Sequence, residues 1–106
     1  MMKISVKSVH FHADSKLIGY VEQKLGRLNR FYDKPAEAEV HLKLQENGSK
    51  FREKIAEIRL QVPGAVLVDK KSGKTFETAV NAMVETLKRQ LVRLKEKNGD
   101  KRELIN

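Results

Sequence analysis

The chain has 106 residues and a formal net charge of +8 at pH 7, and it contains no cysteine. Disulfides, thiolate catalysis and thiolate metal sites are therefore excluded. No apolar run approaches the about 20 residues of a membrane-spanning helix. The N-terminal segment MMKISVKSVH also lacks the apolar core of a signal peptide. We expect one cytoplasmic domain with a single modest core, and a partner that is anionic rather than a membrane.

The first third of the chain predicts a strand and then an amphipathic helix. Strand signals cover Lys3 to Val9. Asp14 is a favourable N-cap, and apolar residues follow it at steps of three and four, which is the period of a helix with one buried side. These apolar residues are Leu17, Val21, Leu25, Leu28 and Tyr32. Beside them runs a polar row of Lys16, Gln23, Arg27 and Arg30, with Lys24 between this row and the core.

The middle of the chain predicts three strands joined by tight turns. Strand signals cover Glu37 to Gln45, Arg52 to Val62 and Ala65 to Lys70. In the first two of these strands, apolar residues alternate with polar ones, which is the pattern of a sheet with one buried and one wet face. The alternating apolar residues are Ala38, Val40, Leu42, Leu44, Ala56, Ile58, Leu60 and Val62. Asn47-Gly48 and Pro63-Gly64 are typical hairpin turns, so consecutive strands should run antiparallel here.

The last third predicts a second amphipathic helix, from Lys74 to Lys97, with Thr75 as its N-cap. Its apolar stripe consists of Phe76, Ala79, Val80, Met83, Val84, Leu87, Leu91 and Leu94. Basic residues border this stripe on both edges: Lys88 and Lys95 on one, and Arg89 and Arg93 on the other. Residues 98–106 are expected to form a short flexible tail.

Together these elements predict an α+β fold in the order β-α-β-β-β-α. The first helix should carry the chain back across the sheet, so that the first two strands are parallel, while hairpins make the other pairs antiparallel. Both helices then cover one face of a four-stranded mixed sheet, an arrangement similar to a double-stranded RNA-binding domain. Residues 1–97 should form this single domain.

Positive charge is concentrated in the two helical segments. Residues 16–34 and 69–106 carry net charges of +3 and +4, whereas residues 35–68 are neutral. A surface made basic only for solubility would not divide in this way, so the pattern indicates that the helices face a large polyanion. Few aromatic residues are available for stacking on single strands, which favours structured RNA bound through its phosphates and shape.

Two smaller patterns suggest chemistry but do not complete a site. The segment SGKT, from Ser72 to Thr75, resembles the end of a phosphate-binding Walker loop, but Val68 replaces the first glycine that this loop requires. His10 and His12 could share one face of a strand, yet no third metal ligand accompanies them, and His41 lies on a different strand. We therefore expect a non-enzymatic protein without a metal, a cofactor or a small-molecule substrate.

Two segments carry a resemblance to a known bacterial family. YVEQKLGRLNRFYDK, from Tyr20 to Lys34, and TFETAVNAMVETLKRQLVRLKEK, from Thr75 to Lys97, resemble the short ribosome hibernation promoting factors, also described as ribosome-associated inhibitors or ribosomal subunit interface proteins. The resemblance spans almost the whole chain. It implies binding to the small ribosomal subunit and its rRNA, in the channel that holds mRNA and the anticodon ends of tRNA. It also implies silencing of translation under stress or in stationary phase.

The resemblance also nominates RNA-binding residues. Basic positions of the family match Lys24 and Arg27 on the first helix, and Arg89, Lys95 and Lys97 on the last helix. Arg30, Lys88 and Arg93 are further basic residues of the same helices, and we expect them to contribute. The sequence carries no dimerisation domain after the last helix, unlike the long relatives, so a monomer is expected.

A function of another class stays open at this stage. The same basic helices could dock an acidic partner protein, which would make the protein a regulator that acts through protein interactions. Salt-sensitive binding to isolated small subunits would favour the rRNA interpretation. Capture of one acidic protein without ribosomes would favour the alternative.

Overall fold

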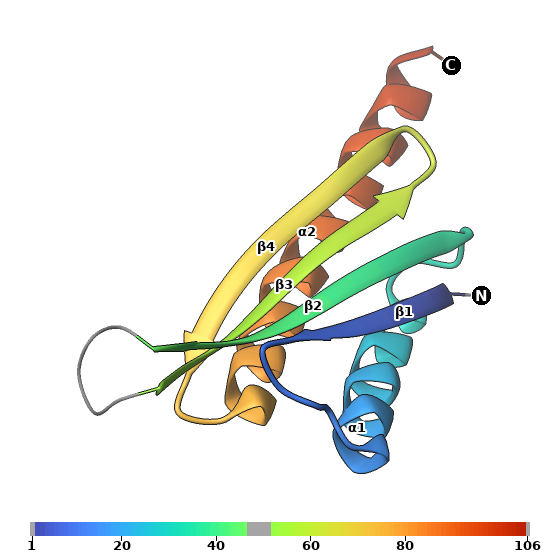
Figure 1. Ribbon diagram of the computed structural model, residues 1–106. Helices are drawn as coiled ribbons and strands as arrows, with labels where there is room; N and C mark the ends of the chain where they lie inside the picture. The colour runs from blue at the N-terminus through green and yellow to red at the C-terminus, as the bar shows by residue number, and fades with distance from the viewer. Residues whose placement is uncertain (1, 47–51, 106) are drawn as a thin grey trace.

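The computed structural model describes the backbone of residues 2–46 and 52–105, and side chains within 2–46 and 53–97. It confirms the predicted α+β fold, because a four-stranded sheet lies in front of two α-helices (Figure 1). The elements are β1 Met2–Val9, α1 Ser15–Gly26, a short 3-10 helix η1 Arg27–Arg30, β2 Ala36–Glu46, β3 Arg52–Val62, β4 Ala65–Gly73 and α2 Phe76–Ile105. Each strand begins and ends within three residues of its predicted bounds.

The strands are ordered β1-β2-β3-β4, so neighbours in sequence are also neighbours in the sheet. β1 is parallel to β2, because α1 carries the chain back across the sheet, and the two later pairs are antiparallel. Pro63 and Gly64 form the tight turn between β3 and β4, where Gly64 has a φ of 81° that glycine adopts without strain. The predicted turn at Asn47-Gly48 lies outside the described residues.

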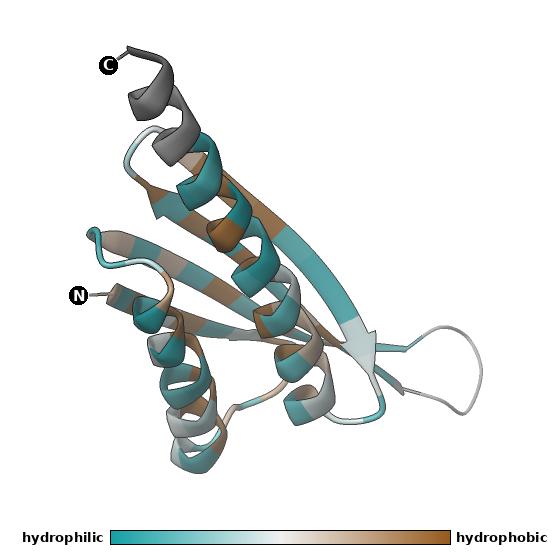
Figure 2. Ribbon diagram, turned by 180° about the vertical axis from the view of Figure 1, so that it is seen from behind, coloured by the Kyte–Doolittle hydropathy of each residue, from teal (hydrophilic) through white to brown (hydrophobic). Residues whose placement is uncertain are grey.

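Both helices cover the same face of the sheet, and the core lies between them and the strands (Figure 2). The alternation in β2 and β3 turns Val40, Leu42 and Leu60 towards the helices, where they are fully buried. The helices contribute further fully buried side chains: Val21 and Leu25 of α1, and Val80, Met83, Leu87 and Leu91 of α2. Burial of such side chains is worth roughly 1.5–3 kcal/mol each, so this layer fixes both helices on the sheet.

Both helices begin where the sequence predicts. Asp14 Oδ1 accepts a hydrogen bond from the Leu17 amide at 2.8 Å, and Thr75 Oγ1 accepts one from the Thr78 amide at 3.0 Å. These bonds satisfy amide groups that the start of a helix leaves without an intrahelical partner. The two N-caps therefore set the starts of α1 and α2.

The ends of the helices differ from the sequence prediction. The apolar spacing predicts one α-helix as far as Tyr32, but α1 ends at Gly26 and the chain tightens into η1. Glycine weakens an α-helix, and a 3-10 turn commonly ends one. Leu28 and Tyr32 are nevertheless buried in the core, as their apolar spacing predicts. α2 continues beyond Lys97 to Ile105, while the flexibility expected of residues 98–106 stays a prediction.

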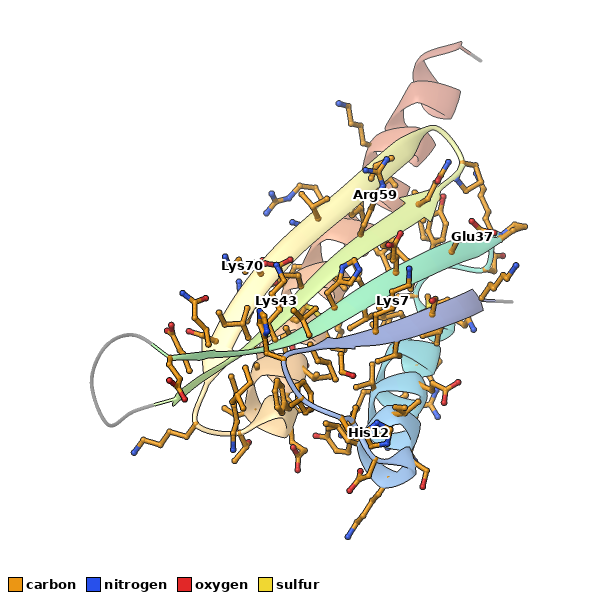
Figure 3. The ribbon with its side chains drawn as sticks, in the orientation of Figure 1. Lys7, His12, Glu37, Lys43, Arg59 and Lys70 are labelled. Atoms are coloured by element: carbon orange, nitrogen blue, oxygen red, sulfur yellow. The ribbon has the colours of Figure 1, made fainter. Side chains whose placement is uncertain are left out.

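The loop after β1 differs from the expectation that His10 and His12 could share one face of a strand. β1 ends at Val9, and His10 turns the chain with a positive φ of 69°. His10 and His12 therefore lie in a loop and do not share a strand face; Figure 3 shows His12 beside the start of α1. Among the described residues, no group of three His, Asp or Glu side chains is placed to hold a metal ion.

Candidate nucleic-acid interface

Helices α1 and α2 meet along a seam, which we define by Tyr20, Lys24, Phe31, Asn81 and Lys88. The Tyr20 hydroxyl donates a hydrogen bond to Asn81 Oδ1 at 2.9 Å and ties the two helices together. Lys24 Nζ lies 5.4 Å from the centre of the Tyr20 ring. Lys88 Nζ lies 4.7 Å from the centre of the Phe31 ring. Both distances allow cation–π attraction, so the seam places two ammonium groups against aromatic faces.

Arg27 and Arg30 extend the positive charge beyond the end of α1. Both side chains are exposed, and both residues belong to η1. Since a 3-10 helix has about three residues per turn, side chains three positions apart lie on the same side. Arg27 also follows Tyr20 by about two helical turns, which puts it on the flank of α1 that faces α2. The 3-10 turn therefore aligns two arginines next to the seam.

The basic residues of α2 lie on two separate flanks. Successive residues of an α-helix are about 100° apart, so Lys95 shares the flank of Lys88 beside the seam. Arg89 and Arg93 point about 100–140° away from Lys88, and Lys97 points about 180° away. The structure thus divides the eight predicted residues into a seam group, Lys24, Arg27, Arg30, Lys88 and Lys95, and a far-flank group, Arg89, Arg93 and Lys97.

All eight residues are available to bind an anion. None of them forms an ion pair with a carboxylate in the part of the chain that the structure describes. Six are exposed, and only Lys24 and Lys88, the two lysines held against rings, are half-buried. Uncompensated cations on one side of a protein maintain a positive potential that a polyanion can neutralise.

The side of the sheet away from the helices, which we call the outer face, has a different charge pattern (Figure 3). One row of side chains crosses all four strands in register: Lys7, His41, Glu57 and Lys70. Glu57 pairs with Lys43 at 3.2 Å and with Lys70 at 3.5 Å. His41 Nε2 lies 3.5 Å from a carboxylate oxygen of Glu39. Opposite charges around Glu57 therefore compensate one another on the outer face, while the exposed Lys7 and Arg59 form no ion pair with a described residue.

The aromatic part of the seam is not evident from the spacing of basic residues. Tyr20 precedes Lys24 by four positions, which is the spacing of neighbours on a helix, so the sequence could have indicated this pair. Phe31 and Lys88 are far apart in the chain, and no local signal connects them. Their contact exists only because the sheet holds α1 and α2 side by side.

Fold and surface together define a small α+β domain whose helical side carries uncompensated positive charge. A family model described as sigma 54 modulation protein / S30EA ribosomal protein matches residues 4–98, which is most of the chain. The chain belongs to this family, that of the ribosome hibernation promoting factors, as the resemblance of its helical segments indicates. Members of the family are ribosome-associated regulators of translation and not enzymes.

Similar proteins support both the family and the fold. A ribosome hibernation promoting factor of Pseudomonas putida is 30% identical over 96 residues, which cover 91% of this chain and 89% of that protein. The N-terminal domain of protein Y from Thermus thermophilus, 26% identical, has a TM-score of 0.73 and covers 88% of this chain and 94% of its own. A ribosomal subunit interface protein from Coxiella burnetii, 18% identical, supports the fold with a TM-score of 0.78, covering 91% of this chain and 99% of its own. No helix in the described ranges is long and apolar enough to cross a membrane.

Proposed function

We propose that this protein binds the rRNA of the small ribosomal subunit in the channel for mRNA and tRNA, and silences translation in the cytoplasm under stress or in stationary phase. The observation that carries the proposal is the contrast between the two sides of the domain. Cations of the helices lack acidic partners among the described residues, whereas Lys43 and Lys70 of the outer face are both paired with Glu57. Phosphates of rRNA supply the missing anions, and membership of the family favours the ribosome as their source.

The seam group and the far-flank group are proposed to contact phosphates rather than base edges. Lysine and arginine on a helix bind phosphate oxygens through charge-assisted hydrogen bonds. The sheet holds α1 and α2 at a fixed spacing, which suits a surface that recognises structured RNA by shape. A domain lodged in the channel excludes mRNA and tRNA by its volume, and this mode of inhibition requires no catalytic group.

Binding to isolated ribosomal subunits tests the proposal. The protein should cosediment with small subunits and not with large subunits, and the bound fraction should fall as salt rises. Small subunits preloaded with mRNA and a P-site tRNA should bind much less protein, because the channel is already filled. Equal binding to empty and preloaded subunits would exclude the channel. Capture of one acidic protein and no ribosomes from a lysate would instead favour the protein-docking alternative.

A further inference from the structure

We propose that Phe31 and Tyr20 are positioning residues, which hold the ammonium groups of Lys88 and Lys24 at fixed places in the seam for contact with RNA phosphates. This inference rests on the proposed function, because it assigns roles within the same RNA-binding side. It goes beyond the charge pattern, since it separates cations held by a ring from cations that are free to rotate.

The backbone at Phe31 is anchored in the core. The residues on either side of its turn, Leu28 and Tyr32, are only 1% and 6% exposed, and the Phe31 amide donates a hydrogen bond to the Leu28 carbonyl at 2.9 Å. On the opposite side of the seam, Lys88 follows the fully buried Leu87. Both backbones are therefore anchored in the core, and the ring of one element faces the ammonium group of the other at 4.7 Å.

Tyr20 is held from both helices. Its backbone belongs to α1, and its hydroxyl donates to Asn81 Oδ1 of α2 at 2.9 Å, so the ring is attached at both ends. Lys24, one helical turn later, places its Nζ over this ring. The position of the Lys24 ammonium group therefore depends on the packing of α1 against α2, because that packing holds the Tyr20 ring.

Holding a lysine beforehand strengthens its contact with a phosphate. A flexible side chain loses rotamer freedom when it binds, and part of this loss is already incurred where a ring orients the side chain in the free protein. An aromatic face accepts the positive charge without using every N–H donor, so the ammonium group still has donors for phosphate oxygens. Arg89 and Arg93 have no such ring partner among the described residues, so they lose their full rotamer freedom when they contact phosphates.

A double-mutant cycle on affinity for isolated small subunits tests the role of Phe31. Phe31→Leu keeps an apolar side chain but removes the aromatic face, and it should weaken binding about two- to fivefold. In a Lys88→Gln background the same change should have little further effect, because the ring has no ammonium group left to hold. Phe31→Tyr should retain the wild-type affinity. The same cycle with Tyr20→Leu and Lys24→Gln tests the second pair.

Two controls separate positioning from a structural role. Phe31→Leu combined with Arg93→Gln should be additive, because Arg93 lies on the far flank. In NMR spectra of the free protein, the ring current of Phe31 should shift the Lys88 side-chain protons upfield, and Phe31→Leu should abolish that shift, whether or not it lowers the melting temperature.

The outcomes distinguish this inference from the proposed function. If wild type fails to bind small subunits, both are overturned. If wild type binds but Lys88→Gln has no effect, or if Phe31→Leu and Lys88→Gln are additive, the positioning role fails and the ribosomal function stands. Coupling between the two residues, together with binding retained by Phe31→Tyr, is the result we expect.

Discussion

Leu60 and Arg59 show how one step along β3 separates the core from solvent. Leu60 is fully buried between the sheet and the helices, opposite Ala38 and Leu67 of the neighbouring strands, whereas Arg59 is exposed on the outer face. Leu60→Asp buries an unpaired carboxylate and should lower the free energy of unfolding by on the order of 4 kcal/mol. Arg59→Asp should lower it by less than about 1 kcal/mol. Denaturant titration measures both, and equal midpoints would mean that the strand phase is wrong.

Glu57 connects the outer face to the pH dependence of stability. Burial raises the pKa of Glu57, but hydrogen bonds and charge from Lys43 and Lys70 outweigh this and lower it below the ordinary 4.5. A carboxylate with a lowered pKa stabilises the fold above its unfolded pKa, and this contribution is lost as the pH falls through the folded pKa.

Glu57→Gln should therefore be less stable than wild type near neutral pH, by at most about 1 kcal/mol because the pairs are partly exposed. The difference should shrink as the pH falls below 4.5, where wild type itself loses the carboxylate. Thermal melting across this pH range measures the effect. A difference that stays constant well below the ordinary pKa would show that the two lysines do not stabilise the ionised form.

At the scale of elements, Thr75 determines where α2 begins. Its hydroxyl accepts the Thr78 amide, and Thr75→Ala should lower the free energy of unfolding by about 1 kcal/mol because this amide loses its partner. Thr75→Ser keeps the acceptor and serves as the matched control. Equal melting temperatures for the alanine and serine variants would contradict the assignment of this cap.

The elements themselves could be predicted from local patterns, except for the C-terminal ends of the two helices. The alternation from Ala56 to Val62 and the turn at Pro63-Gly64 define β3 and its hairpin without any tertiary information. The change from α1 to η1 could not be predicted, because Leu25, Leu28 and Tyr32 follow one another at steps of three and four, which are the steps of a continuous α-helix.

The candidate site was only partly predictable. Periodicity correctly places Lys88 and Arg89 on different edges of α2, since that depends only on the geometry of one helix. Which edge faces α1 depends on how the sheet arranges the two helices, and so does the contact of Lys88 with Phe31. Tertiary packing therefore determines which basic residues of α2 lie beside the seam and which lie on the far flank.

At the scale of the whole molecule, the edges of the sheet bear on self-association. The exposed large apolar side chains of the described residues are Val66 and Val68 on the edge strand β4. Farther along β4, Asp69 and Lys71 form an ion pair at 3.0 Å on the side towards α2, and charged edge residues of this kind discourage pairing with another strand.

We therefore expect a monomer at micromolar concentration. Two valines offer far less than the roughly 1,200 Å² that a stable interface buries. Light scattering of the purified protein should give the mass of one chain. A stable dimer that is lost in a Val68→Lys variant would instead identify β4 as an interface.

The central claim is that the helices, and not the outer face, bind rRNA. The most direct test is the salt dependence of affinity for isolated small subunits, measured for wild type, Arg89→Gln with Arg93→Gln, and Lys7→Gln with Arg59→Gln. Lys7 and Arg59 are exposed on the outer face (Figure 3), so the second double variant removes the same charge from the other side. The slope of log affinity against log salt should fall by roughly one to two units in the helical variant and stay unchanged in the outer-face variant, with both melting temperatures preserved. An equal loss of slope in the outer-face variant would contradict the account, because only non-specific attraction would then remain.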